Sequence, residues 1–298
     1  MKTPIFTGSG LAMITPMNPD GSVNYTEIDR ILEDQIAAGT DAIISCGTTG
    51  EASTLDDQEH LDVIGHVVKQ VNGRIPVIAG TGSNNTAHAV MMSKEAADLG
   101  ADALLVVTPY YNKTSQAGLV ASYTAIADAT DLPVIMYNVP SRTGVNIAPE
   151  TAKTLSAHPK INAIKEASGN ISQVAKIAAL CGDDLNIYSG NDDQIVPLLS
   201  LGGKGVISVL AHVAPRQTHD ICQLWFDGKA AESAALQLEL LDLCNVLFCD
   251  MNPIPVKAAM NMLGYNAGEC RLPLVPTGEA NLAKVRAALI NHGLLSEN

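Results

Sequence analysis

The feature of this sequence that most constrains its fold is a series of short apolar runs along its first three quarters. Successive runs begin 20 to 34 residues apart, which is about the length of a strand followed by a crossover helix. The eight runs are Leu11–Pro16, Ala42–Gly47, Pro76–Thr81, Ala103–Pro109, Pro133–Asn138, Ile161–Glu166, Leu185–Gly190 and Gly205–Leu210. We interpret each run as a β-strand.

The segments between the runs have the period of an amphipathic helix. In the first segment, one helical face is formed by Ile28, Ile31, Leu32 and Ile36. Asn24 and Asp56 are each followed three residues later by a glutamate, as in a capping box at a helix start. Eight alternating units of apolar strand and helix favour an α/β fold closed as a (β/α)8 TIM barrel rather than an open sheet.

After about residue 229 the strand pattern stops. The helical segments that follow are residues 230–248, 253–263 and 278–292. The sequence therefore predicts a catalytic barrel over residues 1–228 and a C-terminal subdomain of three helices over residues 229–298.

Composition limits where the chain works and what it binds. Its net charge is −13, and such a surface repels phosphate backbones, so we expect no nucleic acid partner. No apolar run approaches the roughly 20 residues that span a bilayer, and the N-terminus lacks signal-peptide features. Six cysteines without a CxxC pair are typical of a reducing compartment. We expect a cytoplasmic protein with no membrane partner.

The sixth strand carries the strongest candidate for chemistry. In such barrels the working residues lie at the C-terminal ends of strands. Alternation places Ala163 and Lys165 on one face and Ile164 on the other. If Ile164 packs against the helices, Lys165 points into the barrel mouth, where burial favours the neutral amine that can attack a ketone. On this strand alone, the simpler alternative is a lysine that reaches solvent or pairs with a carboxylate.

Neighbouring segments could complete a site for a keto acid. Tyr137 ends the fifth strand at the same height, and its phenol can transfer protons. Thr48 and Thr49 follow the second strand, and their hydroxyls can donate to a carboxylate. The guanidinium of Arg142 has the geometry to bind another carboxylate. Taken singly, these residues also fit a core tyrosine, a turn and a surface arginine.

Motifs for other chemistries do not fit. The segment Gly80–Asn85 lacks the third glycine of a dinucleotide fingerprint, and Gly203–Gly205 lacks the rest of a P-loop. There is no HExxH motif, and histidines and cysteines do not cluster at ligand spacing. We expect no metal and no bound cofactor.

Five motifs together resemble the dihydrodipicolinate synthase family, a branch of the pyruvate-dependent class I aldolases. In chain order they are Gly47–Glu51, Thr108–Asn112, Tyr137–Gly144, Ile164–Gly169 and Ser189–Asp193. The resemblance runs in register from Gly8 to about Arg271. It implies a lyase that joins pyruvate to L-aspartate 4-semialdehyde through a Schiff base on Lys165. The product would be 4-hydroxy-tetrahydrodipicolinate, which feeds diaminopimelate and lysine biosynthesis.

The resemblance also implies roles for individual residues. Tyr137, Thr48 and Tyr111 would form the proton relay, and Thr48 and Thr49 would hold the pyruvate carboxylate. Arg142 would bind the carboxylate of the semialdehyde.

Two further positions, Gly190 and Ile207, correspond to those where the family lines the imine pocket with backbone groups. In that family the tyrosine at the position of Tyr111 enters the site of a neighbouring subunit. The resemblance therefore implies a tight homodimer, commonly paired into a homotetramer.

The family's feedback site for lysine is only partly matched. Its positions here are Ala52, Asp57, His60, Asn84, His88 and Tyr110. Asp57 stands where a histidine is usual, Ala52 where a serine is usual, and His88 where a glutamate binds the amines of the effector. Because an imidazole does not replace that carboxylate as a partner for a cation, we expect weak or absent inhibition by lysine.

Two alternatives stay open at this point. The first is a sister aldolase that cleaves N-acetylneuraminate or a 2-keto-3-deoxy sugar acid with the same lysine and tyrosine. Those enzymes usually have Ser-Thr in place of Thr48 and Thr49 and lack an arginine at position 142. The second is a barrel that binds a ligand without catalysis.

Overall fold

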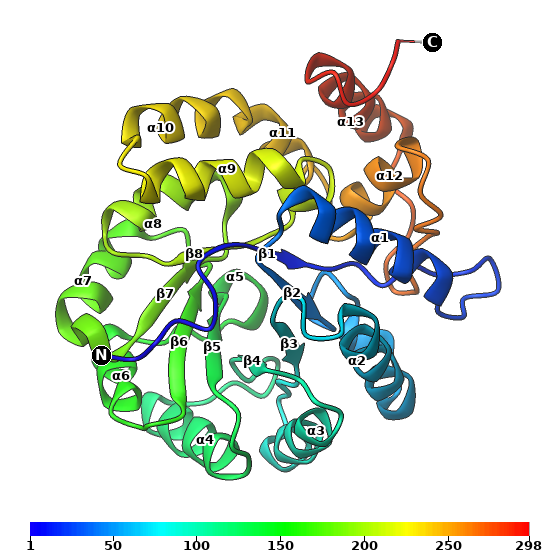
Figure 1. Cartoon of the computed structure of the whole chain (residues 1–298). Coiled ribbons are helices and arrows are strands. Elements are labelled where there is room, and N and C mark those ends of the chain that lie inside the picture. Colours follow the sequence, from blue (N-terminus) through cyan, green and yellow to red (C-terminus); the bar gives the residue numbers. More distant parts are fainter. Residues whose placement is uncertain (298) are drawn as a thin grey trace.

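Eight parallel strands close into a barrel, with β8 pairing back to β1 (Figure 1). The structure is a computed structural model and describes residues 1–297. Its strands are β1 (Gly8–Ala12), β2 (Ala42–Ser45), β3 (Val77–Gly80), β4 (Ala103–Val107), β5 (Val134–Asn138), β6 (Ile161–Glu166), β7 (Asn186–Ser189) and β8 (Gly205–Ser208). The predicted (β/α)8 barrel is confirmed.

Helices surround the barrel and connect its strands. They are α1 (Tyr25–Ala38), α2 (Asp57–Val71), α3 (Thr86–Asp98), α4 (Gln116–Asp128), α5 (Pro140–Thr143), α6 (Pro149–Ser156), α7 (Ile171–Cys181), α8 (Ile195–Ser200) and α9 (Pro215–Phe226). The predicted caps are present: the side chains of Asn24 and Asp56 accept hydrogen bonds from the backbone N–H groups of Glu27 and Glu59. Sequence-local capping therefore fixes where α1 and α2 begin.

The first strand begins three residues before its predicted start at Leu11. Glycines have low strand propensity, so the pattern hid this segment. Packing explains the glycine at position 10, since an added Cβ would lie 2.8 Å from both Phe6 Cζ and Ile44 Cδ1. Phe6 in turn stacks on Tyr188 at 4.4 Å between ring centroids, and the Tyr188 hydroxyl donates to the Phe6 carbonyl at 2.7 Å. These two rings fill the N-terminal end of the barrel.

The apolar core forms two layers. The inner layer fills the barrel and includes Ile78, Ile135 and Ile207. The outer layer packs the strands against the helices and contains Ile164. Because Ile164 faces the helices, its neighbour Lys165 faces the inside of the barrel, as the alternation predicted.

The C-terminal region contains four helices rather than the three predicted. They are α10 (Ala230–Glu239), α11 (Leu241–Val246), α12 (Ile254–Met262) and α13 (Glu279–Asn291). The predicted helix over residues 230–248 is interrupted at Leu240, whose backbone has φ −90° and ψ 5°. The turn lets α10 pack on α8 and α9 while α11 packs on α13. The domain boundary at residue 229 stays a prediction.

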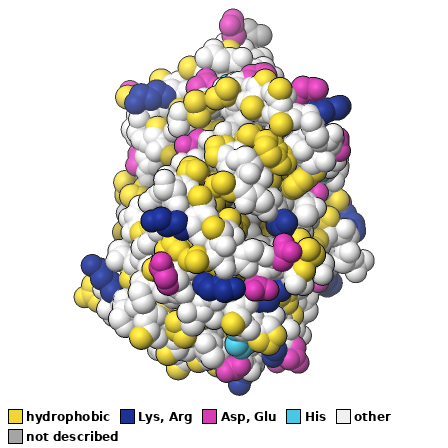
Figure 2. Space-filling model, turned by 90° about the vertical axis from the view of Figure 1, so that its left-hand side faces the viewer, with side chains coloured by type: hydrophobic (Ala, Val, Ile, Leu, Met, Phe, Trp, Pro, Cys, Tyr) yellow, Lys and Arg dark blue, Asp and Glu magenta, His cyan; other side chains and the backbone are white. Residues whose placement is uncertain are grey.

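Two surface properties bear on partners. Across residues 1–297, every helix is too short or too polar to cross a membrane. On the face drawn in Figure 2, acidic and basic side chains are interspersed and form no continuous band of one sign. The negative net charge is therefore not concentrated on this face.

One buried histidine gives the fold a dependence on pH. Nε2 of His212 accepts from the backbone N–H of Ile14 at 3.0 Å, and Nδ1 donates to the Val209 carbonyl at 2.9 Å. Burial lowers the pKa of His212 to about 4. The ring is therefore neutral when folded but takes up a proton near pH 6.5 when unfolded.

We expect the free energy of unfolding to fall by about 3 kcal/mol as the pH drops from 6.5 to 4, because in this range the unfolded chain binds one more proton than the folded chain. The measurement is urea unfolding of the wild type and His212→Gln across this range. A glutamine can still donate and accept but does not titrate, so its curve should lose this component. Parallel curves would contradict the assignment.

Candidate active site

Lys165 lies inside the mouth of the barrel at the end of β6. Its side chain is buried, at 6% exposure, which excludes a lysine that simply reaches solvent. In the sheet it pairs with Tyr137 of β5, and Nζ lies 4.3 Å from the centre of the Tyr137 ring. The structure thus brings together the two residues that the strand ends predicted.

The carboxylate next to Lys165 has other partners. Glu166 is buried and accepts from the Asn138 side chain at 3.0 Å, from the Gln173 side chain at 3.1 Å and from the Ser168 backbone N–H at 2.7 Å. These bonds fix the loop after β6. Sequence analysis did not assign this role, because alternation shows only that Glu166 faces away from Lys165.

The side chain of Lys165 passes so close to the backbone at position 190 that only a glycine fits there without a shift. A Cβ on this residue would lie 3.0 Å from Cε of Lys165 and 2.6 Å from Cβ of Ala167. Ile207 is buried on β8 in the inner core. Gly190 thus directly follows β7 and Ile207 lies near the end of β8, the two strands that follow β6.

A buried carboxyl group, which sequence analysis missed, connects these two strand ends. Asp192 follows β7, and its Oδ2 accepts from the backbone N–H groups of Val209 at 3.0 Å and Leu210 at 2.9 Å. Burial raises the pKa of Asp192. The loop after β8, which starts directly beyond Ile207 and Ser208, is thereby held against the loop after β7.

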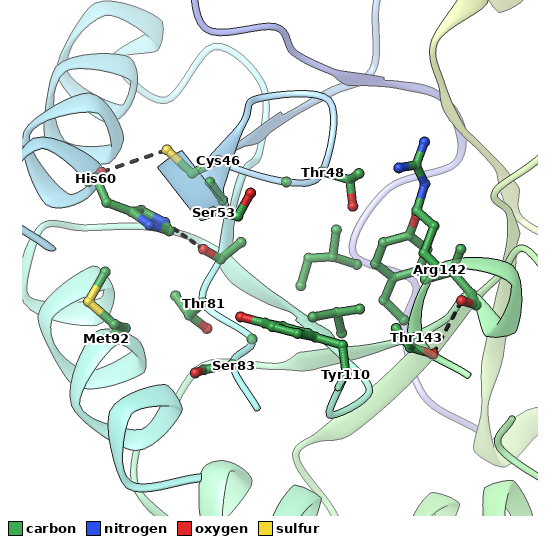
Figure 3. Close-up of a pocket in the computed structure, with 18 of the residues that line it drawn as sticks. Cys46, Thr48, Ser53, His60, Thr81, Ser83, Met92, Tyr110, Arg142 and Thr143 are labelled. Atoms are coloured by element: carbon green, nitrogen blue, oxygen red, sulfur yellow. Dashed lines mark hydrogen bonds between the residues drawn. The ribbon is translucent and has the colours of Figure 1, made fainter. Parts of the chain in front are cut away.

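A cavity of about 290 Å³ lies at the C-terminal ends of β2 to β5 (Figure 3). In the view of Figure 3, Thr48 and Arg142 lie toward one side of this cavity, His60 and Met92 lie toward the other, and Tyr110 lies between them. Tyr137 also lines it. The relay tyrosine, one predicted threonine and the predicted arginine therefore share one cavity.

The two adjacent threonines have different surroundings. Thr48 lines the cavity. Thr49 is buried, at 4% exposure, and its Oγ1 accepts from the side chain of Asn252 at 3.0 Å. Asn252 is 203 residues away in the sequence and belongs to no motif, so no signal in the sequence could have identified this contact.

Arg142 comes from the short helix α5, which directly follows β5. Its Nη2 donates to the Asn252 carbonyl at 3.4 Å, and Nη1 lies 3.5 Å from the sulfur of Met251. The guanidinium thus lies between the cavity and the C-terminal helices. This position suits the anion-binding role predicted for it.

Tyr111 stands apart from this group. Its side chain is 92% exposed, and its backbone has φ 67°, in the left-handed region that is uncommon for a non-glycine residue. It does not line the cavity of its own chain, whereas its neighbour Tyr110 does. Within one chain, the structure does not bring Tyr111 to Lys165.

Four of the six effector positions line the same cavity, namely Ala52, His60, His88 and Tyr110. Nε2 of His88 lies 2.9 Å from Oδ1 of Asp57. Nε2 of His60 bonds the Gly80 carbonyl at 2.8 Å, and burial lowers the pKa of His60. A carboxylate at position 57 therefore already has an imidazole as its partner.

The sixth effector position, Asn84, contributes its backbone carbonyl, which accepts from the Asn112 side chain at 2.9 Å. Across residues 1–297, no three histidine, cysteine or acidic side chains are grouped so that they could hold a metal ion. The fold and the site together define a barrel enzyme in which a buried lysine lies next to a phenol, and this phenol shares a cavity with hydroxyl and guanidinium groups.

Comparisons with known proteins identify the family. Residues 5–292 match the Dihydrodipicolinate synthetase family, and the chain belongs to this family. It is 57% identical over 291 residues to the 4-hydroxy-tetrahydrodipicolinate synthase of Caldicellulosiruptor saccharolyticus, covering 98% of each chain.

Solved structures of dihydrodipicolinate synthases have the same fold as this chain. Dihydrodipicolinate synthase from Thermotoga maritima has a TM-score of 0.96 at 41% identity, over 98% of this chain and all of that one. The chloride-inhibited enzyme from Acinetobacter baumannii, complexed with pyruvate, has a TM-score of 0.95 at 42% identity, over 97% and 99% of the two chains.

Proposed function

We propose that this enzyme, a lyase of the dihydrodipicolinate synthase family, condenses pyruvate with L-aspartate 4-semialdehyde through a Schiff base on Lys165. The observation that carries the proposal is the buried Lys165 amine, 4.3 Å from the ring of Tyr137. The relative from Acinetobacter baumannii was solved with pyruvate, which supports pyruvate as the first substrate. The activity is that of a 4-hydroxy-tetrahydrodipicolinate synthase in diaminopimelate and lysine biosynthesis.

The reaction follows from the groups present. The neutral amine of Lys165 adds to the keto carbon of pyruvate, and loss of water gives an imine. Loss of a proton from the methyl carbon gives an enamine, which attacks the aldehyde carbon of the semialdehyde. The amino group of that substrate then attacks the imine carbon, closes the ring and releases the lysine. Pyruvate and semialdehyde thus give 4-hydroxy-tetrahydrodipicolinate and one water.

The remaining site residues support separate steps. The phenol of Tyr137 moves protons while the imine forms and while the substrate amine displaces the lysine, and Thr48 relays them. Thr48 and Thr49 hold the pyruvate carboxylate, while Arg142 binds the carboxylate of the semialdehyde. Gly190 and Ile207 line the imine pocket with backbone groups. We propose that no cofactor takes part, because the lysine itself supplies the covalent chemistry, and that the enzyme works in the cytoplasm.

Replacing the nucleophile tests the proposal directly. Treatment with borohydride and pyruvate should leave a reduced adduct on the peptide that contains Lys165, as read by mass spectrometry. Lys165→Ala should form no adduct, and turnover should fall by at least about 10³-fold because the covalent route is lost. Lys176→Ala, on the exposed side of α7, is the matched control. An active Lys165→Ala enzyme, or an adduct elsewhere, would overturn the mechanism.

The exposure of Tyr111 supports a dimer as the active unit. A tyrosine that is 92% exposed and remote from its own Lys165 can join the proton relay only in a neighbouring subunit. We propose a tight homodimer in which Tyr111 enters the partner's site, with two dimers forming a tetramer.

Mixing two inactive variants tests this exchange. In a dimer of Lys165→Ala with Tyr111→Phe, one site contains both substitutions and the other contains neither. After random subunit exchange, half the dimers are mixed, so about one quarter of the wild-type activity should return. If Tyr111 served its own subunit, every site in the mixed dimer would carry one defect and no activity would return.

The response to lysine stays a prediction. Position 88 carries an imidazole in place of a carboxylate, and the nearby carboxylate of Asp57 already contacts this imidazole at 2.9 Å. We expect initial rates to be unaffected by micromolar L-lysine. His88→Glu should increase sensitivity, because it restores a carboxylate, whereas His88→Gln should not. Clear micromolar inhibition of the wild type would refute the expectation.

A further inference from the structure

The C-terminal region reaches the candidate site through one buried amide. Asn252 lies between α11 and α12 and is 5% exposed. Its side-chain N–H donates to Oγ1 of Thr49 at 3.0 Å, and its backbone carbonyl accepts from Arg142 at 3.4 Å. A single residue therefore contacts both of the side chains assigned to the two substrate carboxylates.

The hydrogen bond from Asn252 to Thr49 also limits the direction in which the hydroxyl hydrogen of Thr49 can point. A threonine hydroxyl has one hydrogen to donate and two lone pairs. Because the amide of Asn252 occupies a lone pair of Thr49, the hydroxyl hydrogen must point elsewhere. In residues 1–297 the hydroxyl of Thr49 makes no hydrogen bond besides the one from Asn252. The ligand that fits this free donor is a group that only accepts, such as a carboxylate.

The other atom of the same amide supports this interpretation. Oδ1 of Asn252 is buried and has no hydrogen-bond partner in the described part of the chain. A buried acceptor without a partner costs about 1–3 kcal/mol, so packing alone would not favour an amide here. The presence of an asparagine at this position is explained if the site requires its side-chain N–H, which donates to Thr49.

Asn252 is presented from a rigid support. Glu51, two residues after Thr49, forms an ion pair of 2.6 Å with Lys257 of α12, and both side chains are 2% exposed. The other oxygen of Glu51 accepts from the backbone N–H of Arg271 at 2.9 Å. The loop that carries Thr49 is thus joined to the C-terminal region through Glu51 as well as through Asn252.

We propose that Asn252 is a positioning residue that turns the hydroxyl hydrogen of Thr49 toward the pyruvate carboxylate. The inference rests on the proposed function, in which Thr49 binds that carboxylate. It makes the segment between α11 and α12 part of the pyruvate site, although this segment lies outside the five motifs that the chain shares with the family.

The first test separates the two substrates. In Asn252→Ala, the apparent affinity for pyruvate, measured by borohydride trapping at increasing pyruvate concentration, should fall about tenfold because a donor to a charged group is lost. The KM for the semialdehyde should change less than about twofold, since Arg142 bonds the backbone carbonyl, which the substitution retains. Equal losses for both substrates would indicate general damage to the site and overturn the proposal.

The second test uses an isosteric change. Asn252→Asp keeps the shape but has only acceptors, so it takes the hydrogen of Thr49 and places a negative charge near the carboxylate. It should therefore bind pyruvate more weakly than Asn252→Ala. If Asn252 were only structural, the isosteric variant would bind pyruvate better than the alanine variant. Asn245→Asp, on the exposed side of α11, adds the same charge elsewhere and should behave as the wild type.

A double-mutant cycle identifies Thr49 as the intermediary. In the Thr49→Val background, where the hydroxyl is already absent, Asn252→Ala should cost less than about twofold in pyruvate affinity. The same tenfold loss in both backgrounds would overturn the proposal. Failure of the wild type to form any pyruvate adduct would instead reject the proposed function, so the two hypotheses fail separately.

Discussion

Closure of the barrel by the pairing of β8 with β1 is the constraint on which the site depends. An open sheet would leave the ends of β2 and β6 on distant strands, whereas a closed ring directs both toward one centre. Lys165 and Gly190 come from adjacent strands of this ring, and Thr48 follows a strand across it. The inner apolar layer includes Tyr137, whose ring centre lies 4.3 Å from the Lys165 amine. The chemistry is thus a property of the closed topology as much as of the residues.

The fold and the inner site could be predicted because both depend on short-range patterns. Alternation along β6 placed Lys165 inside the barrel, and the capping residues marked the starts of α1 and α2. The pattern failed where local propensity and packing disagree: the glycines of β1 hid its first residues, and Leu240 interrupts a segment with a continuous helical period. In both places the determining contacts come from distant parts of the chain.

The outer parts of the site were less accessible to sequence reasoning. Asn252, Glu166 and Asp192 act through hydrogen bonds to residues that no periodic pattern connects with them. The buried pair of Glu51 and Lys257 joins segments more than 200 residues apart. Thr49 illustrates the difference: its place in a motif suggested a ligand contact, but only the structure shows that Asn252 donates a hydrogen bond to its hydroxyl. A sequence motif thus indicates which side chains are candidates to contact a substrate, whereas the tertiary contacts determine how those side chains are oriented.

The stacked rings of Phe6 and Tyr188 have a consequence for the order of events. Both rings are buried in the inner core, whereas the cavity lined by Thr48 and Arg142 lies at the opposite end of the barrel, so substrates would approach from the C-terminal ends of the strands. Lys165 is buried next to Tyr137, and Tyr137 lines the same cavity as Thr48 and Arg142. In the proposed mechanism, the keto acid therefore enters and becomes attached to Lys165 before its reaction partner binds. In that mechanism, the position of the cavity at one end of the barrel determines the order in which the two substrates bind, without any moving gate.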